Sequence, residues 1–395
     1  MRLALAALAA LLAVTLAACT DPPMQASVSV AEALSGDTTG YARADRVRPF
    51  VFPADHGPHP AFKTEWWYVT GNLRATDGSG RRFGVQFTVF RSALSPDTSA
   101  RRASDWATTQ LYMAHVALSD VAGGGFYSEE RFARGAAGLA GASADPVHVW
   151  LGPVDLAATG APGAGGAVPL RITGSAEGAA FRLDARPTKP VVLQGDRGLS
   201  QKGAEPGNAS YYYAQTRMAT SGTVTLPGGE AVPVEGLTWL DREWSTSALA
   251  GGQTGWDWFA LHLDDGRDLM LYQLRGPDGR ADPLSEGSLV DADGRKTRLA
   301  ASDFSLAPLA RWTAPDGAEY PTRWRARVPS AGIDVEVTAL VEASELDATV
   351  RYWEGAVDVS GGLTGSGFLE MTGYADARPA RSGALSRTTT GASGG

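Results

Sequence analysis

The feature of this sequence that most constrains its fold is a β-hairpin pattern that occurs twice. The first copy runs from Glu65 to Arg91 and the second from Trp256 to Arg275. In each copy an alternating, aromatic-rich segment is followed by an Asp-Gly pair and by an apolar segment that ends in arginine. An Asp-Gly pair between alternating apolar segments is a strong local signal for a hairpin. The repetition predicts two related β-domains, each with a wide apolar interior, and favours a protein that holds a hydrophobic ligand.

The composition agrees with this interpretation. A chain of 395 residues has room for two domains, and 48 glycines with 44% hydrophobic residues are typical of a turn-rich globular β-protein. Short alternating segments recur while helical periodicity is scarce, which favours barrels or sandwiches. Two Gly-Ala-rich segments, 135–144 and 160–167, are predicted to be irregular loops. The net charge of −8, without a basic cluster interleaved with aromatic residues, argues against nucleic acid as a partner.

The N-terminal residues are typical of an export signal. The apolar segment 3–18 follows a basic residue, and it is short for a membrane span but suitable for a signal peptide. The sequence Leu-Ala-Ala-Cys that ends at Cys19 resembles a bacterial lipobox, in which the thiol is lipidated after cleavage. An ordinary secretory signal is the alternative, but Cys19 is the only cysteine of the chain. Because Thr20 follows, we predict an exported lipoprotein anchored at the periplasmic face of the outer membrane.

Two places combine a polar group with an apolar strand. Glu65 precedes two tryptophans, and Arg91 ends the returning strand of the same hairpin. A carboxylate beside two indoles would have a raised pKa and could donate a proton, whereas the simpler interpretation is an ion pair at a barrel end. His115 lies in a second apolar strand. Strand alternation leaves open whether it is a hydrogen-bonded core residue or faces a ligand.

A third place is the segment 239–245, which we expect between the two domains. Asp241, Arg242 and Glu243 are adjacent there and lie between two tryptophans. This density of charge is unusual for a plain linker. The segment is either a salt-bridged domain junction or the floor of a pocket, with Asp241 and Glu243 on one face of a strand.

Signatures of common enzyme classes are missing from the sequence. It has no phosphate-binding Gly-Lys-Ser/Thr loop and no His-Glu-x-x-His motif. His56 and His59 lie in a Gly-Pro loop without a nearby third metal ligand, so we predict a solvated pair. The sequence thus predicts neither a metal site nor a cofactor.

Several of these segments together resemble the AttH/CrtC family, which comprises AttH-type secreted lipoproteins and carotenoid 1,2-hydratases. The AttH branch is the more similar of the two. The matching segments are Glu65–Leu73, Phe87–Arg91, Ala114–Asp120, Trp239–Trp244, Gly255–Phe259, Tyr352–Val357 and Gly367–Tyr374. The resemblance implies an all-β fold of two tandem lipocalin-like (calycin) antiparallel β-barrels. Our boundaries are a signal peptide 1–18, a tether 19–45, an N-terminal domain 46–245, a C-terminal domain 246–378 and a flexible tail 379–395.

The resemblance also implies a hydrophobic ligand and an association with ABC export systems. We therefore predict a lipid-anchored protein that binds a lipid or an isoprenoid. The polar end of the ligand pocket would be formed by Glu65, Arg91, Asp241 and Glu243. The predicted ligand-binding residues are Trp66, Tyr68, Arg91, His115, Trp244, Trp256 and Trp258.

The main alternative is an enzyme, either a carotenoid 1,2-hydratase-like lyase that adds water across a terminal alkene or a secreted hydrolase. Its candidate catalytic acids are Asp241, Glu243 and Glu65, and the first barrel is where we expect the active carboxylate. Many members of the family have histidine at the position of Arg242, whose guanidinium stays protonated, and this departure argues against a hydratase. A third possibility is an accessory subunit of an ABC transporter.

Overall fold

The structure is a computed structural model. It describes residues 37–97, 104, 106–246 and 249–375. The predicted signal peptide, Cys19, most of the tether and the tail 379–395 lie outside these residues. The predicted all-β fold is confirmed, because the helical turns of the described part are three short 3-10 turns, at Ala54–His56, Ala301–Asp303 and Pro329–Ala331. No helix in that part is long and apolar enough to cross a lipid bilayer.

The first antiparallel sheet has 13 strands in the order β4-β3-β2-β1-β13-β12-β9-β8-β7-β6-β5, with β10 and β11 pairing β12. Its strands are β1 (Thr64–Ala75), β2 (Arg82–Ala93), β3 (Gln110–Asp120), β4 (Gly125–Arg134), β5 (Ala140–Ala144), β6 (Val147–Leu151), β7 (Val154–Ala158), β8 (Leu170–Ala176), β9 (Ala179–Pro187), β10 (Val192–Leu193), β11 (Leu199–Gln201), β12 (Ala209–Thr225) and β13 (Ala231–Ser245).

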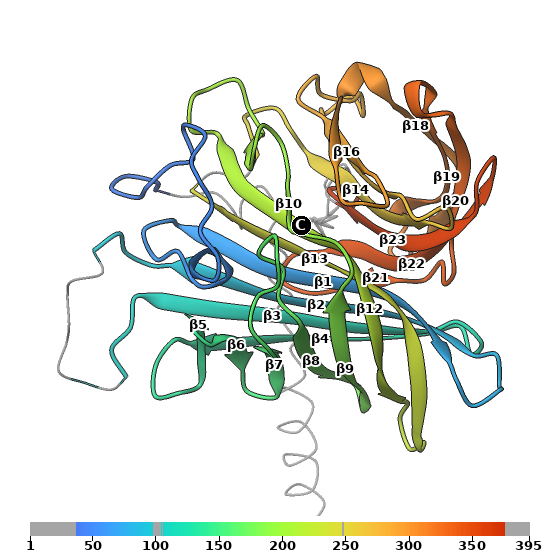
Figure 1. Ribbon diagram of the computed structural model, residues 1–395, viewed down its shortest axis with the longest axis horizontal. Helices are drawn as coiled ribbons and strands as arrows, with labels where there is room; N and C mark the ends of the chain where they lie inside the picture. The colour runs from blue at the N-terminus through green and yellow to red at the C-terminus, as the bar shows by residue number, and fades with distance from the viewer. Residues whose placement is uncertain (1–36, 98–103, 105, 247–248, 376–395) are drawn as a thin grey trace, which may run out of the picture.

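The second antiparallel sheet has 10 strands in the order β17-β16-β15-β14-β23-β22-β20-β19-β18, with β21 pairing β22. Its strands are β14 (Gly255–Leu263), β15 (Asp268–Arg275), β16 (Glu286–Val290), β17 (Lys296–Ala300), β18 (Ser305–Thr313), β19 (Glu319–Val328), β20 (Ile333–Ala339), β21 (Glu345–Leu346), β22 (Tyr352–Gly361) and β23 (Gly365–Thr372). In Figure 1 this sheet curls round its own core, above the flatter first sheet.

Both predicted hairpins are present, and they occupy corresponding places in the two sheets. β1 pairs with β2 across the first Asp-Gly turn and also with β13, the last strand of its sheet. β14 pairs with β15 across the second turn and also with β23, again the last strand. The two sheets therefore repeat one topology, in which the hairpin connects the start of a sheet to its end.

Each hairpin strand has one face toward its own core and one toward the other sheet. On β1, Trp67 and Val69 belong to the first core, and Tyr68 packs with side chains of the second sheet. The sheets approach closely at Gly84 on β2, where a Cβ atom would lie 2.8 Å from the Cβ atom of Ala356 on β22. Apolar side chains fill both interiors. The expectation of a wide interior for a ligand in each domain is therefore wrong, and Trp66, Tyr68, Trp256 and Trp258, which were predicted to line it, lie between the sheets.

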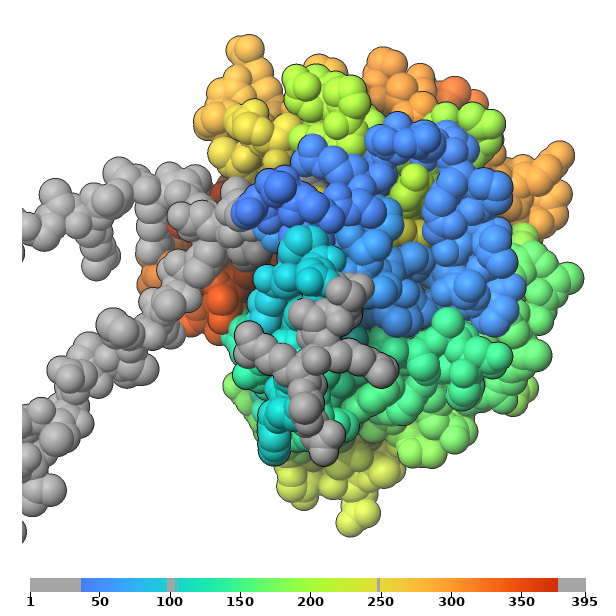
Figure 2. Space-filling model, turned by 90° about the vertical axis from the view of Figure 1, so that its left-hand side faces the viewer, coloured from blue at the N-terminus to red at the C-terminus, as the bar shows by residue number. Residues whose placement is uncertain are grey.

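Two local expectations also need correction. The Gly-Ala-rich segment 135–144 is not wholly irregular, because its second half is β5, which pairs with β6. The charged residues Asp241–Glu243 do not lie between the two domains along the chain, because they belong to β13 in the middle of the first sheet and pair with β1. Asp241 and Glu243 do share one face of that strand, as predicted. The segment before β1, dark blue in Figure 2, lies across one face of the molecule, where Phe52 packs against Tyr213 at 5.2 Å between ring centroids.

Candidate active site between the two sheets

A cavity of about 170 Å³ lies between the two sheets. Its walls come from β1, β2, β3, β12 and β13 on one side and from β14, β15, β22 and β23 on the other. A single buried water needs only about 10–15 Å³ of such space, so the cavity has room for an organic molecule. Both domains are therefore required to form this site.

Aromatic side chains from both sheets line the cavity. Trp66 and Phe90 come from the first sheet, with their ring centroids 6.2 Å apart. Trp256 and Trp258 come from the second sheet, and Trp258 meets Tyr68 edge-on at 5.3 Å. Such rings bind flat apolar molecules, and their faces also stabilise a positive charge.

Four carboxyl groups reach the same cavity, and two of them face each other. Asp241 and Glu243 come from β13, and Glu354 and Glu370 come from β22 and β23, where they are direct cross-strand partners. Like charges directly opposite on neighbouring strands repel, so such a pair is stable only when it shares a proton. We did not predict Glu354 and Glu370 from the sequence, although each stands next to two large apolar residues, as Glu65 does.

Three of these carboxyl groups have raised pKa values. Burial, together with the neighbouring Glu370, raises the pKa of Glu354 well above its usual value. Burial raises the pKa of Glu370 to about 8, and Glu243 adds to the effect. Burial also raises the pKa of Asp241 well above its usual value. At neutral pH these groups are therefore held mainly in the protonated form, which can donate a proton.

Each of these three acids accepts a hydrogen bond from a neighbouring side chain. The Tyr68 hydroxyl donates to Oε2 of Glu354 at 2.6 Å, and Trp256 Nε1 donates to Oε1 of Glu370 at 3.2 Å. Trp239 Nε1 donates to Oδ1 of Asp241 at 2.9 Å. The other oxygen of Asp241, Oδ2, is buried and has no hydrogen-bond partner among the described residues. The Tyr212 hydroxyl also acts on this carboxyl and lowers its pKa, but burial has the larger effect.

Glu243 differs from the other three because a cation lies next to it. Its Oε1 is 3.4 Å from Nζ of Lys202 and also accepts a hydrogen bond from Ser210. Burial opposes the charge of Lys202, but Glu243 and Tyr272 outweigh burial and raise the pKa of the amine to about 12. The Lys202 amine also lies 4.1 Å from the centroid of the Tyr272 ring. Glu243 therefore belongs to an ion pair in the cavity wall.

Of the residues predicted from the sequence, the structure brings seven together around the cavity. They are Trp66, Tyr68, His115, Trp256, Trp258, Asp241 and Glu243. His115, whose direction the sequence left open, turns toward the cavity and is completely buried. Within the described residues, no group of three or more His, Cys, Asp or Glu side chains is arranged to hold a metal ion.

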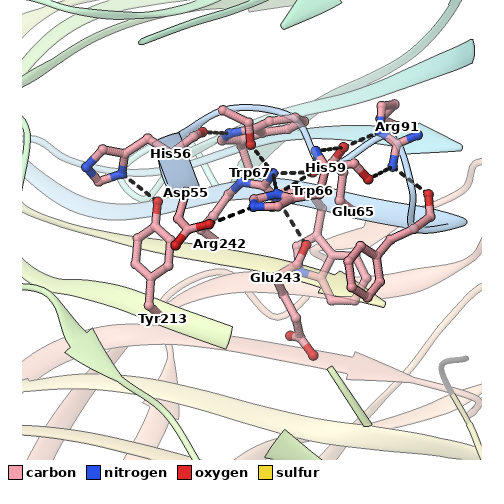
Figure 3. Close-up of polar contacts among 12 residues, drawn as sticks. Asp55, His56, His59, Glu65, Trp66, Trp67, Arg91, Tyr213, Arg242 and Glu243 are labelled. Carbon is pink, nitrogen blue, oxygen red and sulfur yellow. Dashed lines mark hydrogen bonds and ion pairs between the residues drawn. The ribbon is translucent and has the colours of Figure 1, made fainter. Parts of the chain in front are cut away.

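Glu65 and Arg91 lie elsewhere, in a buried ion cluster beside the first core (Figure 3). The Glu65 carboxylate accepts hydrogen bonds from Arg91, from Arg242 and from the backbone N–H of His59. Burial alone would raise its pKa, but the two guanidinium groups together hold the pKa of Glu65 well below its usual value. The expectation of a raised pKa is therefore wrong. Glu65 stays ionised and cannot serve as the proton donor, and the acids of the cavity come from both sheets.

Arg242 and Trp244 also face away from the cavity, because they alternate along β13 with Asp241 and Glu243. Figure 3 shows the Glu243 carboxylate pointing away from the cluster that holds Arg242. The guanidinium of Arg242 lies 3.9 Å from the centroid of the Trp67 ring, and the His59 ring stacks on Trp244 at 3.7 Å. Arg242 therefore lies outside the cavity, and the arginine at this position does not remove a proton donor from it.

The prediction of a solvated pair at His56 and His59 is wrong as well. His56 is 2% exposed, and its Nδ1 lies 2.6 Å from the Tyr213 hydroxyl. Nε2 of His59 lies 3.0 Å from Oδ1 of Asp55. Both rings hold the segment before β1 against the first sheet, because this segment folds back onto strands that lie far away in the sequence.

Comparison with known proteins agrees with this architecture. Residues 43–374 match the model of a family described as AttH-like. The crystal structure of a putative AttH from Nitrosomonas europaea is 34% identical, has a TM-score of 0.71, and covers 84% of this chain and 99% of its own. Kievitone hydratase from Nectria haematococca shares the fold at 16% identity, with a TM-score of 0.59 over 82% of this chain and 93% of its own. The predicted fold of two lipocalin-like domains is thereby confirmed.

Two curated proteins match part of the sequence. Kievitone hydratase from Fusarium solani subsp. phaseoli is 29% identical over 201 residues, which are 47% of this chain and 53% of that protein. Dehydratase asqC from Emericella nidulans is 24% identical over 180 residues, which are 44% of this chain and 50% of that protein. The chain spans about half the length of these curated relatives.

Proposed function

This chain belongs to the AttH-like family, and on that premise we propose that it is a hydratase or dehydratase that acts on a hydrophobic, unsaturated molecule between its two sheets. The observation that carries the proposal is the set of protonated carboxyl groups, Asp241, Glu354 and Glu370, in a cavity with aromatic walls. The names of the two curated relatives, a hydratase and a dehydratase, support the same class of reaction.

The chemistry of hydration suits these groups. A protonated carboxyl donates its proton to one carbon of an alkene, and the adjacent carbon becomes a cation. The faces of Trp66, Trp256 and Trp258 lie on the cavity wall, where they stabilise such a cation. Water then forms a bond to that carbon and loses a proton to a base, and dehydration is the same sequence in reverse. We assign the donor to Asp241, which lines the cavity and whose pKa burial raises well above its usual value.

The experiment that tests this proposal is hydration in water enriched in heavy oxygen. Purified protein is incubated with acyclic isoprenoids, acyclic carotenoids among them, and mass spectrometry detects the product that has gained one labelled water. We expect the rate to fall at high pH, because burial holds the pKa of the donor Asp241 well above its usual value and only the protonated carboxyl donates. If no member of the panel gains or loses water at any pH, the proposal is wrong.

A second candidate is binding without reaction, which the apolar part of the same cavity favours. The aromatic lining would hold a lipid or an isoprenoid for an ABC export system, as we predicted from the resemblance. Native mass spectrometry of protein extracted from its own membrane separates the two candidates. A carrier should retain an unmodified ligand after prolonged incubation, whereas a hydratase should release a product that differs by one water.

We also propose that Cys19 anchors the protein to a bacterial outer membrane through a lipid. The support is the lipobox-like sequence before Cys19. The change Cys19→Ala is expected to move the protein from the membrane fraction to the soluble fraction, because one lipid-modified thiol is the whole anchor. Fractionation followed by immunoblotting measures this. A variant that stays in the membrane fraction would contradict the anchor.

A further inference from the structure

A chain of three hydrogen-bonded side chains leads out of the cavity. It begins at Tyr352, the first residue of β22, whose hydroxyl is hydrogen-bonded to Nδ1 of His115 on β3. Nε2 of His115 lies 2.8 Å from Oε1 of Glu130, its cross-strand partner on β4. Tyr352 and His115 both line the cavity, and they belong to different domains. None of the groups discussed so far as proton donors belongs to this chain of residues.

The hydrogen bonds determine which atom of each pair carries the hydrogen. The Glu130 carboxylate accepts from the backbone N–H of Thr349 at 3.2 Å and from its hydroxyl at 2.8 Å. Although burial opposes it, hydrogen bonds from His115 and Thr349 lower the pKa of Glu130, so this carboxyl is ionised and only accepts. Nε2 of His115 must then carry the hydrogen. In the neutral ring Nδ1 is consequently an acceptor, and the Tyr352 hydroxyl donates to it.

This arrangement leaves the Tyr352 oxygen with its lone pairs free for the cavity. Its own hydrogen is already directed to His115, so the phenol can only accept from a bound molecule. We propose that Tyr352, His115 and Glu130 form a proton relay that deprotonates the water attacking the substrate. The inference rests on the hydration proposed above and assigns the base that this reaction requires.

The step conserves protons. As the water oxygen forms its bond to the cationic carbon, its proton passes to the Tyr352 oxygen. The Tyr352 proton passes at the same time to Nδ1 of His115, and the imidazolium is paired with Glu130. The acid has lost one proton to the substrate and the relay has gained one. Once the product leaves, the Nδ1 proton passes back to the Tyr352 oxygen and the phenol gives its other proton to water in the cavity. The ring then carries its hydrogen on Nε2 alone again, and the acid takes up one proton.

Burial and charge favour this role over a purely structural one. His115 is completely buried, yet both of its ring nitrogens have polar partners. The titratable groups around Tyr352 are Glu354, Glu370 and Glu130, and burial with these three raises the pKa of the phenol. A free phenolate is therefore disfavoured. Transfer of the phenolic proton to a histidine, in step with the arrival of another proton, avoids that charge.

The decisive variant is His115→Gln. Glutamine can accept from Tyr352 and donate to Glu130, so it keeps both hydrogen bonds, but it cannot take up a proton. We expect kcat to fall by roughly a hundredfold or more with little change in KM, which is the scale of lost general-base catalysis. Tyr352→Phe should reproduce the loss of kcat.

The matched control is His148→Gln. His148 also pairs with a carboxylate, with its Nε2 2.6 Å from Oδ2 of Asp155, but His148 lies on β6 and Asp155 on β7, and neither lines the cavity. This variant should keep the full rate, and the thermal unfolding of all variants should show that they are folded. If His115→Gln folds and keeps its rate, the relay is wrong while the hydratase stands. If the wild-type protein hydrates nothing, both proposals fail.

Nitrogen NMR of the imidazole tests the relay independently of turnover. The neutral His115 ring should carry its hydrogen on Nε2, and Tyr352→Phe should change the signal of Nδ1 while Nε2 keeps its hydrogen. A neutral ring with the hydrogen on Nδ1 would overturn the relay, because Tyr352 would then have no acceptor for its proton.

Discussion

Replacement of Asp241 by asparagine is expected to lower the hydration rate by roughly a hundredfold to ten-thousandfold, the range for loss of a general acid. Asparagine has nearly the same shape and still accepts the hydrogen bond from Trp239, but its amide cannot donate a proton to an alkene carbon. Burial raises the pKa of Asp241, so the wild-type side chain carries that proton at neutral pH. The effect should appear in kcat, since the proton is transferred only in the reaction, and steady-state kinetics with the labelled-water assay measures it.

The control for this variant is Asp184→Asn. Asp184 lies on β9 and pairs with Arg171 at 2.8 Å, with 42% of its side chain exposed, and it does not line the cavity. The same chemical change there should leave kcat unaltered. If Asp241→Asn is folded and retains more than about a tenth of the rate, Asp241 is not the acid, and the facing pair Glu354 and Glu370 becomes the place to test next.

The fold was largely predictable because its main signals are local. An Asp-Gly turn between two alternating segments requires only neighbouring residues, so the hairpins β1–β2 and β14–β15 follow from short stretches of sequence. Their repetition predicts two related domains. No short segment of the sequence predicts the long-range pairing of β1 with β13 and of β14 with β23. It depends on which strands complete each sheet.

The position of the site was harder to predict, because both faces of β1 are apolar. Trp67 lies on one face, in the first core, and Tyr68 lies on the other, against the second domain. Strand alternation separates the two sets of side chains but does not tell which set faces a core. The site was therefore expected inside the barrels, whereas it lies between them. Trp66, Trp256 and Trp258 were identified correctly as neighbours in space, because their density signals an aromatic surface, whereas Trp244 lies on the other side of β13.

The chemistry of the carboxyl groups depends on partners that are distant in the sequence. From its neighbours in the sequence, Glu65 is a good candidate for a raised pKa. The pairing of β1 and β13, however, places Arg242, 177 positions later, beside it. Glu354 and Glu370 are 16 residues apart and become unusual only when the register of β22 and β23 sets them opposite each other. Sequence patterns therefore identify the carboxyl groups, and the register of the sheets decides which of them are acids.

Replacement of Glu65 by glutamine is expected to lower the free energy of unfolding by about 3–5 kcal/mol, the usual cost of removing one partner from a buried ion pair. Glutamine keeps the size of the side chain but leaves two guanidinium groups, those of Arg91 and Arg242, buried without their negative partner. Glu336→Gln is the control, because Glu336 pairs with Arg323 near the surface, where such a change costs about 1 kcal/mol or less. Urea titration followed by tryptophan fluorescence measures both differences.

The pH dependence of stability separates this charge effect from a loss of packing. The pKa of Glu65 is lowered in the folded protein, so its ionised form stabilises the fold at pH values above its unfolded value, near 4.5. That stabilisation is lost progressively as the pH falls below 4.5 toward the folded value. The wild-type protein should therefore lose more stability than Glu65→Gln between neutral and acidic pH, and the two should converge in acid. If their difference were the same at every pH, the cluster would stabilise the protein through shape rather than through charge, and the account of Glu65 as a fixed anion behind the cavity wall would be wrong.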